Sequence, residues 1–171
     1  MNAIFELKRL YVLFKMNIGS HQDCIDWAVE RLQNDQDTGD FDIALLAAAT
    51  KREEVLPLVE KVLSNYLDLA AIDEQFEAGK YVVSLYQAYR GGKETVESLD
   101  DKFSKLYCNL EYPEWLVMLS RNCEYATDIP PYLEPFEDEF EYIANLWLNS
   151  QTREEFESKY SLKISNQHDL K

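Results

Sequence analysis

The chain has 171 residues, of which 46% are hydrophobic and 13% aromatic, a composition that argues against intrinsic disorder. Its 32 Asp and Glu residues outnumber 17 Lys and Arg, giving a formal net charge of −15. A surface with this much negative charge repels phosphate backbones and anionic lipid. We therefore expect that the protein binds neither nucleic acid nor membranes, and that its partner is a basic protein. The length predicts a single helical domain over residues 1–171, with a frayed tail at 165–171.

The compartment is inferred from the cysteines and the apolar runs. Cys24, Cys108 and Cys123 are odd in number and widely spaced. The uninterrupted apolar runs Leu10–Phe14 and Ile43–Ala49 are too short for a signal-peptide core or for a membrane span of about 20 residues. We therefore expect a cytoplasmic protein with free thiols.

Apolar residues recur at helical spacing in almost every segment, and no segment alternates as a strand does. In the first half, helices are expected from Ala3 to a break at Ile18-Gly19, from Ser20 to Asn34, from Asp40 to Ala49 and over 55–66. In the second half, they are expected over 72–90 before Gly91-Gly92, over 99–110, from Pro113 to Leu119, from Pro135 to Trp147, and after Thr152. The third helix is apolar nearly all round, which favours a central position. With no fixed repeat, the prediction is an all-α fold, an irregular bundle of eight or nine short helices.

Helix starts are marked by capping residues. Ser20 and Asp40 are expected to cap the helices that follow them. Thr50 and Glu53 have the spacing of a capping box, but Pro57 stands in the apolar stripe behind them. Because proline lacks an N–H, that helix either begins near position 54 or kinks at Pro57.

No set of metal ligands is complete. The acidic string 35–42 resembles a calcium loop in composition, but counting from its first residue puts Gly39 at a ligand position and Leu46 where a bidentate Glu belongs. His21 and Cys24 share a helical face, yet a zinc site needs about four ligands and the remaining Cys and His lack paired spacing. We expect no metal and no cofactor.

Catalytic motifs are also missing from the sequence. It contains no Gly-x-Gly-x-x-Gly, no phosphate-binding loop and no nucleophile elbow. Cys24 lies close to Asp23 and Asp26, whose negative charges raise the pKa of a thiol and reduce its reactivity. The prediction is therefore a protein that is not an enzyme, with no catalytic residue.

Five acids cluster in the helix expected from Pro135. They are Glu134, Glu137, Asp138, Glu139 and Glu141. An inward stripe of that helix is predicted to hold Phe136, Phe140, Ile143 and Trp147, so the acids face outward. No basic residue lies between Arg121 and Arg153 to neutralise them. They form either a solvated helix face or an electronegative docking surface.

Aromatic residues favour the docking surface. Tyrosines and a tryptophan flank the proline-rich loop and this cluster: Tyr112, Trp115, Tyr125 and Tyr132. A partly exposed tyrosine beside acids has the composition of a protein-binding hot spot. The predicted partner-binding residues are Tyr132, Glu134, Glu137, Asp138 and Glu141. The second choice is Asp35, Asp37 and Asp40, whose shorter loop is expected to cap a helix.

The N-terminal third carries a resemblance. The segment from Trp27-Ala28 through Leu32, followed by Phe41-Asp42-Ile43-Ala44-Leu45-Leu46-Ala47, is similar to small bacterial helical proteins that resemble the immunity proteins of polymorphic toxin and contact-dependent growth inhibition systems. Over the rest of the chain the likeness is in size, acidity and helical content. The resemblance implies a cytoplasmic protein that binds and neutralises a cognate toxin domain. Such families share no invariant binding residues, so no site is carried over.

Three functions follow from these features. An inhibitor that occludes a basic toxin, typically a nuclease, predicts tight and salt-sensitive pairing. The alternative, an acidic helical adaptor in another cytosolic complex, predicts a broad apolar groove and weaker salt dependence. An enzyme of unrecognised chemistry predicts a closed pocket with perturbed titratable groups. We expect the first.

Overall fold

The computed structural model describes residues 2–34 and 39–168, with side chains over 3–34 and 39–162. It is 79% helical, and the described residues form nine α-helices, two short 3-10 turns and no strand. The predicted all-α class, with short helices in an irregular arrangement, is confirmed. No helix in the described ranges combines the length and the apolar character that crossing a membrane requires.

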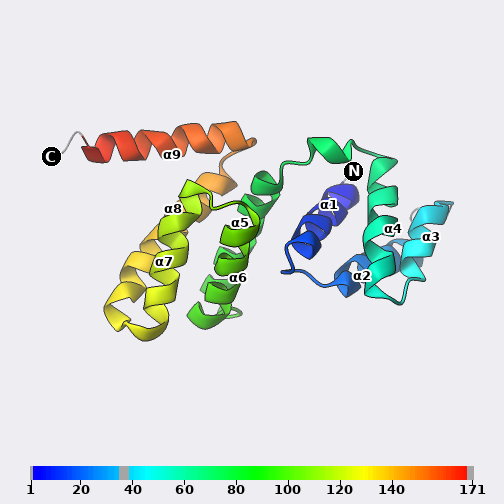
Figure 1. The fold of residues 1–171 in the computed structure, drawn as a ribbon, viewed down its shortest axis with the longest axis horizontal. Helices are drawn as coiled ribbons and strands as arrows, with labels where there is room; N and C mark the ends of the chain where they lie inside the picture. The colour runs from blue at the N-terminus through cyan, green and yellow to red at the C-terminus, as the bar shows by residue number, and fades with distance from the viewer. Residues whose placement is uncertain (1, 35–38, 169–171) are drawn as a thin grey trace. The chain divides into compact units, whose positions relative to one another are not determined.

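The chain divides into two compact units, Met1–Ile72 and Asp73–Lys171, coloured blue to green and green to red in Figure 1. The first unit contains α1 (Asn2–Lys15), α2 (His21–Gln33), α3 (Phe41–Ala47), α4 (Arg52–Ser64) and the 3-10 turn η1 (Leu69–Ala71). The second contains α5 (Glu74–Arg90), α6 (Val96–Asn109), α7 (Glu114–Asp128), the 3-10 turn η2 (Pro130–Tyr132), α8 (Leu133–Leu148) and α9 (Arg153–His168). A single domain stays a prediction.

In the first unit, α1, α2 and α4 pack together and α3 lies against α2 and α4. The predicted cap at Ser20 is confirmed: its hydroxyl accepts from the Gln22 N–H at 3.1 Å, and the Asp23 carboxylate accepts from the Ser20 N–H at 2.8 Å. The indole N–H of Trp27 donates to the Ala3 carbonyl at 3.1 Å, which joins α2 to α1.

The central position expected for the third helix is wrong. Only Ile43 and Leu46 are buried in α3, and Phe41 is 72% exposed. Because α3 has only seven residues, it buries one narrow face against its neighbours and leaves its other apolar side chains partly or largely exposed. Overall apolarity therefore did not indicate depth in the core.

The start of α4 also differs from expectation. Lys51 is the N-cap and makes no side-chain capping bond, so the capping box between Thr50 and Glu53 does not form. The helix begins at Arg52, close to the start considered from the sequence, and it contains Pro57. A kink at Pro57 stays a prediction. Since proline has no N–H, the Glu53 carbonyl lacks its usual donor within the helix.

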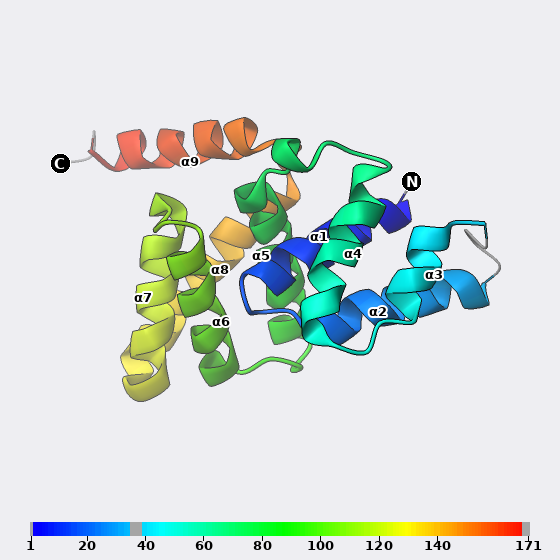
Figure 2. The ribbon, with the colours of Figure 1, turned by 45° about the vertical axis from the view of Figure 1, so that its right-hand side comes forward.

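The second unit is built on four helices that alternate in direction from α5 to α8, with α9 running across the end where α8 finishes (Figures 1 and 2). Five large aromatic side chains are fully buried there: Phe103, Phe136, Phe140, Trp147 and Phe156. The predicted inward stripe of α8 is thus confirmed. At the end of α5, Gly92 has φ +71° and the Lys93 N–H donates to the Ala88 carbonyl at 2.8 Å, the pattern of a Schellman cap.

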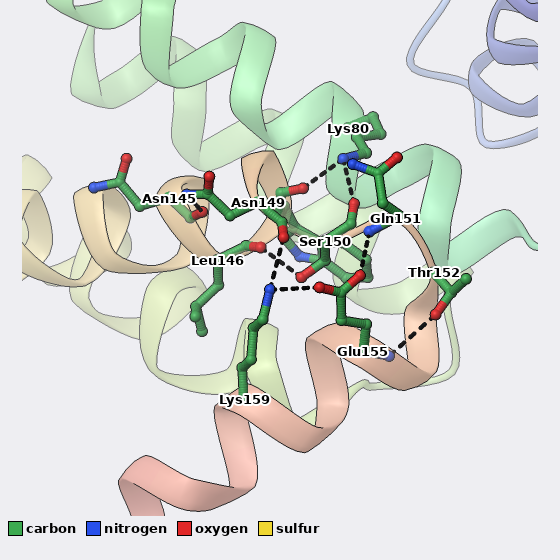
Figure 3. A network of polar contacts seen from close by, with 10 residues as sticks. Lys80, Asn145, Leu146, Asn149, Ser150, Gln151, Thr152, Glu155 and Lys159 are labelled. Atoms are coloured by element: carbon green, nitrogen blue, oxygen red, sulfur yellow. Dashed lines mark hydrogen bonds and ion pairs between the residues drawn. The ribbon is translucent and has the colours of Figure 1, made fainter.

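Two lysines hold the carboxyl end of α8 (Figure 3). The Lys80 ammonium donates to the Trp147 and Ser150 carbonyls at 2.5 and 2.7 Å. The Lys159 ammonium donates to the Asn149 carbonyl at 2.6 Å. Carbonyls at a helix C-terminus have no helical donors and lie at the negative end of the helix dipole, so both positive charges stabilise this end.

The same junction starts α9. The Glu155 N–H donates to the Thr152 hydroxyl at 3.1 Å, and the Glu155 carboxylate accepts from the Gln151 N–H at 2.7 Å. Residues 165–168 of the expected frayed tail continue α9, whereas 169–171 lie outside the described residues.

Candidate functional site

The predicted partner-binding residues lie where α7 turns through η2 into α8, at the end of α8 opposite α9 (Figure 1). Tyr132 ends η2, and Glu134 and Asp138 follow on the exposed side of α8. Glu134 and Asp138 are four residues apart, so their carboxylates lie on one helical face. These three predicted residues are presented to solvent together.

Glu137 and Glu141, the other two predicted residues of α8, interact with tyrosines of α5. The Tyr89 hydroxyl of α5 donates to the Glu137 carboxylate at 2.7 Å. Burial, then the hydrogen bond and charge of Glu137, raise the pKa of Tyr89 to about 12. Burial, followed by the charge of Glu141, raises the pKa of Tyr86. Glu137 therefore attaches α8 to α5 through Tyr89, whereas Glu141 is exposed and acts on Tyr86 through its charge. Glu134 and Asp138 are exposed and hydrogen-bond no tyrosine of the described residues.

Tyr132 is paired with a second tyrosine. Its ring meets that of Tyr125 edge to face, with centroids 5.0 Å apart and planes at 68°. Tyr125 is 38% exposed and Tyr132 37% exposed. Within the described ranges, neither hydroxyl has a hydrogen-bonding partner. The pair thus offers both ring area and phenol groups to a ligand.

Apolar and acidic neighbours extend this pair into a surface. Ile129 and Leu133, which adjoin the tyrosines through η2, are exposed large apolar side chains. Four acids close to these residues in the chain are also exposed: Glu124, Asp128, Glu134 and Asp138. We call the following eight residues the tip surface: Tyr125, Ile129, Tyr132, Leu133, Glu124, Asp128, Glu134 and Asp138.

The carboxylates of the tip surface are not neutralised by basic side chains of the described residues. None of the four forms an ion pair with the part of the chain that the structure describes. Elsewhere acids are paired, as Asp42 is with Lys61 at 2.8 Å and Glu155 with Lys159 at 2.7 Å. Arg121, the nearest base before the tip surface in the chain, donates to the sulfur of Met118 at 3.0 Å. The tip surface is therefore apolar at its tyrosines and strongly negative around them.

The second-choice acids are less suited to binding. Asp35 and Asp37 lie outside the described residues. Asp40 accepts from the N–H groups of Asp42 and Ile43 at 3.0 and 3.2 Å, so it caps α3 as expected. Its other oxygen accepts from the Tyr66 hydroxyl at 2.9 Å. Both oxygens of Asp40 are thus already hydrogen-bonded.

The described ranges assemble no cluster of metal ligands, and two of their three free cysteines are buried, whereas Cys108 is exposed. Nowhere in them do three His, Cys, Asp or Glu residues gather closely enough to hold a metal ion. Cys24 and Cys123 are buried, and burial, followed by nearby carboxylates, raises the pKa of each thiol to about 12. Neither thiol is ionised at neutral pH, and the thiolate is the nucleophilic form.

A concave site lies in the first unit instead. An open cavity of about 430 Å³ is lined by Phe14, Lys15, Asn17, Arg52, Glu53, Leu56 and Pro57. The Arg52 guanidinium donates to the Asn17 side-chain oxygen at 2.7 Å and stands 5.3 Å from the centre of the Phe14 ring. Lys15 and Glu53 are the lining residues of a type that can act as nucleophile or base, and the described lining contains no Ser, Cys or His.

Sequence reasoning placed Tyr125 near the site but missed its contact with Tyr132, and it missed Ile129 and Leu133. The available signal was the spacing of 125, 129, 132 and 133, which repeats at one helical turn across the two prolines. Comparisons with protein-family models, with curated proteins and with solved structures gave no match.

Proposed function

We propose that this protein is a cytoplasmic immunity protein that neutralises a cognate basic toxin domain by covering it with the tip surface. The observation that carries the proposal is the exposed Tyr125–Tyr132 pair set among four carboxylates without ion pairs in the described residues. The net charge of −15 and the resemblance of the N-terminal third to immunity proteins support it.

Charge and aromatic packing act at different stages of such an interaction. Opposite fields accelerate the encounter, to about 10⁸ M⁻¹s⁻¹ or more at low salt against roughly 10⁵–10⁶ M⁻¹s⁻¹ for neutral surfaces. Aromatic side chains buried at the centre of an interface then slow dissociation. A nuclease toxin suits this arrangement, because a surface that attracts phosphate also attracts carboxylates. Inhibition by occlusion needs no catalytic group on the inhibitor.

A second candidate is an acidic helical adaptor in another cytosolic complex. It is favoured by Val117 and Met118, which are exposed nearer the start of α7 and would give a partner a longer apolar face along that helix. Binding by such a longer apolar face would depend less on salt than binding by the carboxylates.

The test uses the product of the neighbouring reading frame. That product is expressed in a bacterial host alone and together with this chain, and growth is measured. The proposal expects growth to be lost with the product alone and restored by co-expression. It also expects a purified complex whose affinity falls as salt is raised. A product that is not toxic, or whose toxicity this chain leaves unchanged, would contradict the proposal.

Two variants connect neutralisation to the tip surface. The double change Glu134→Lys and Asp138→Lys should abolish protection. The matched control, Asp26→Lys with Glu30→Lys on α2, makes the same change in net charge at the same spacing on another exposed helix face and should protect normally. Equal protection by both variants would place the binding surface elsewhere.

A further inference from the structure

We infer that the tip surface is a receptor for an arginine side chain of the partner, and that it selects arginine over lysine. The inference rests on the proposed function and adds the chemistry of the group that is recognised. The guanidinium would stack on the open ring face of the Tyr125–Tyr132 pair while a carboxylate of the tip surface accepts its N–H groups.

The geometry of the tyrosine pair suits a planar cation. In an edge-to-face pair, the edge of one ring covers one face of the other, so the pair itself leaves the remaining faces uncovered. Tyr125 and Tyr132 each expose more than a third of their surface. Ring faces are electron-rich and attract cations, and guanidinium groups stack on them.

In the first unit, an arginine of the chain itself combines a contact with an aromatic ring and a hydrogen bond to a side-chain oxygen. The Arg52 guanidinium stands over the Phe14 ring and donates to a side-chain oxygen of Asn17. Arg31 likewise stands 5.9 Å from the centre of the Trp27 ring. No cation of the described residues covers Tyr125 or Tyr132 in this way.

The carboxylates define which cation is preferred. Glu134 and Asp138 stand one turn apart on α8, and Glu134 follows directly after the apolar part of the tip surface. A carboxylate binds a guanidinium through two parallel hydrogen bonds, whereas lysine acts as a compact and strongly hydrated point charge. Both cations gain from the negative field, but only arginine gains fully from stacking and from the paired bonds.

A second copy of this chain does not fit as the occupant. The surface carries four carboxylates that form no ion pair with the described residues, and a self-complementary contact would bring two such sets together. The two sets of negative charges would repel each other across such a contact. The surface is complementary to a positively charged partner and not to itself.

The experiment uses two short synthetic peptides that are identical except that one carries arginine where the other carries lysine. Each is titrated into the full chain, with affinity measured by calorimetry and the binding site mapped by amide chemical shifts. We expect the arginine peptide to bind roughly 2–5-fold more tightly for each exchanged residue. The shifts should centre on residues 125–138. Equal affinities, no binding by either peptide, or shifts confined to other helices would overturn the inference.

Variants separate the ring from the charge. Tyr125→Leu with Tyr132→Leu keeps the surface apolar but removes both ring faces, and it should equalise the two peptides. Tyr125→Phe with Tyr132→Phe keeps the ring faces and should keep the preference, which also controls for folding. Glu134→Gln with Asp138→Gln should weaken both peptides and reduce the salt dependence. A preference for arginine that survives the leucine variant would overturn the role of the rings.

The outcomes distinguish this inference from the proposed function. If the chain neutralises the neighbouring product but binds the two peptides equally, occlusion stands and arginine selection fails. If the arginine peptide is preferred but the neighbouring product is not neutralised, the receptor stands and the immunity function fails.

Discussion

Gly79 in α5 lies against the indole of Trp147 in α8 so closely that a methyl group added to Gly79 would be 2.2 Å from ring carbon Cδ2. The Phe156 ring of α9 stacks parallel to the same indole, with centroids 3.7 Å apart and planes at 6°. Trp147 therefore joins three helices of the second unit, and Gly79 allows α5 to approach it.

The change Gly79→Ala should destabilise the protein. A contact that short requires the helix or the ring to move, and overpacking of a core costs roughly 1–3 kcal/mol. Alanine returns about 0.5–1 kcal/mol through its better helix propensity, so the net effect remains a loss. Urea denaturation measures it. The control is Gly39→Ala, whose added methyl group would meet nothing within 4 Å. Unchanged stability in Gly79→Ala would show that α5 and α8 are not packed this tightly.

Removing the indole itself should cost more. Trp147 is fully buried, and Trp147→Ala should lower the free energy of unfolding by roughly 3–5 kcal/mol, the usual range for a buried large aromatic. Its neighbour Leu148 is 53% exposed, so Leu148→Ala should lie within about 0.5 kcal/mol of the parent. Similar losses in the two variants would mean that the inward stripe of α8 is misassigned.

Lys80 should matter far more than a surface lysine. Lys80→Met leaves the Trp147 and Ser150 carbonyls without their charged donor, which should cost roughly 1–3 kcal/mol. Lys105→Met removes only an exposed pair with Asp101 at 2.7 Å and should cost less than about 1 kcal/mol. Thermal or urea unfolding of both variants compares them directly, and equal losses would contradict a capping role for Lys80.

Tyr89 should make the protein less stable in strong base. Its pKa is raised from 10.0 to about 12 in the folded protein, so between these values the folded state holds a proton that the unfolded state has released. The stabilisation is complete below pH 10 and is lost as pH rises towards 12. Tyr89→Phe cannot ionise, so its stability should fall less steeply over this range. Parallel slopes for parent and variant would contradict the raised pKa of Tyr89 in the folded protein.

Short-range sequence patterns predicted where the helices lie better than they predicted which residues of different helices are in contact. The burial of Trp147 follows from the helical spacing of its stripe, and the Ser20 cap follows from one residue and its position. The hydrogen bond from Tyr89 to Glu137 joins residues 48 positions apart, and no periodicity encodes that pairing. For the same reason the sequence grouped Glu137 with Glu134, although one attaches α8 to α5 and the other faces solvent.

At the candidate site, too, the sequence predicted individual residues but not the contacts between helices. The exposure of Tyr132, Glu134 and Asp138 at one turn could be predicted from the acidic, proline-rich composition there. The ring contact with Tyr125 depends on how η2 folds α8 back along α7, which composition does not specify. Phe41 illustrates the opposite case, since its apolar segment favoured the core and its ring lies in solvent.

The central claim is that the carboxylates of the tip surface steer a basic partner onto the protein. The most direct measurement is the rate of association with the product of the neighbouring reading frame, from low to high salt, for the parent, for Glu134→Lys with Asp138→Lys, and for the control Asp26→Lys with Glu30→Lys. All three should retain helical circular dichroism. The account predicts that the tip variant alone loses at least about tenfold in association rate at low salt, together with most of its salt dependence. An association rate and salt slope that match those of the control would contradict it.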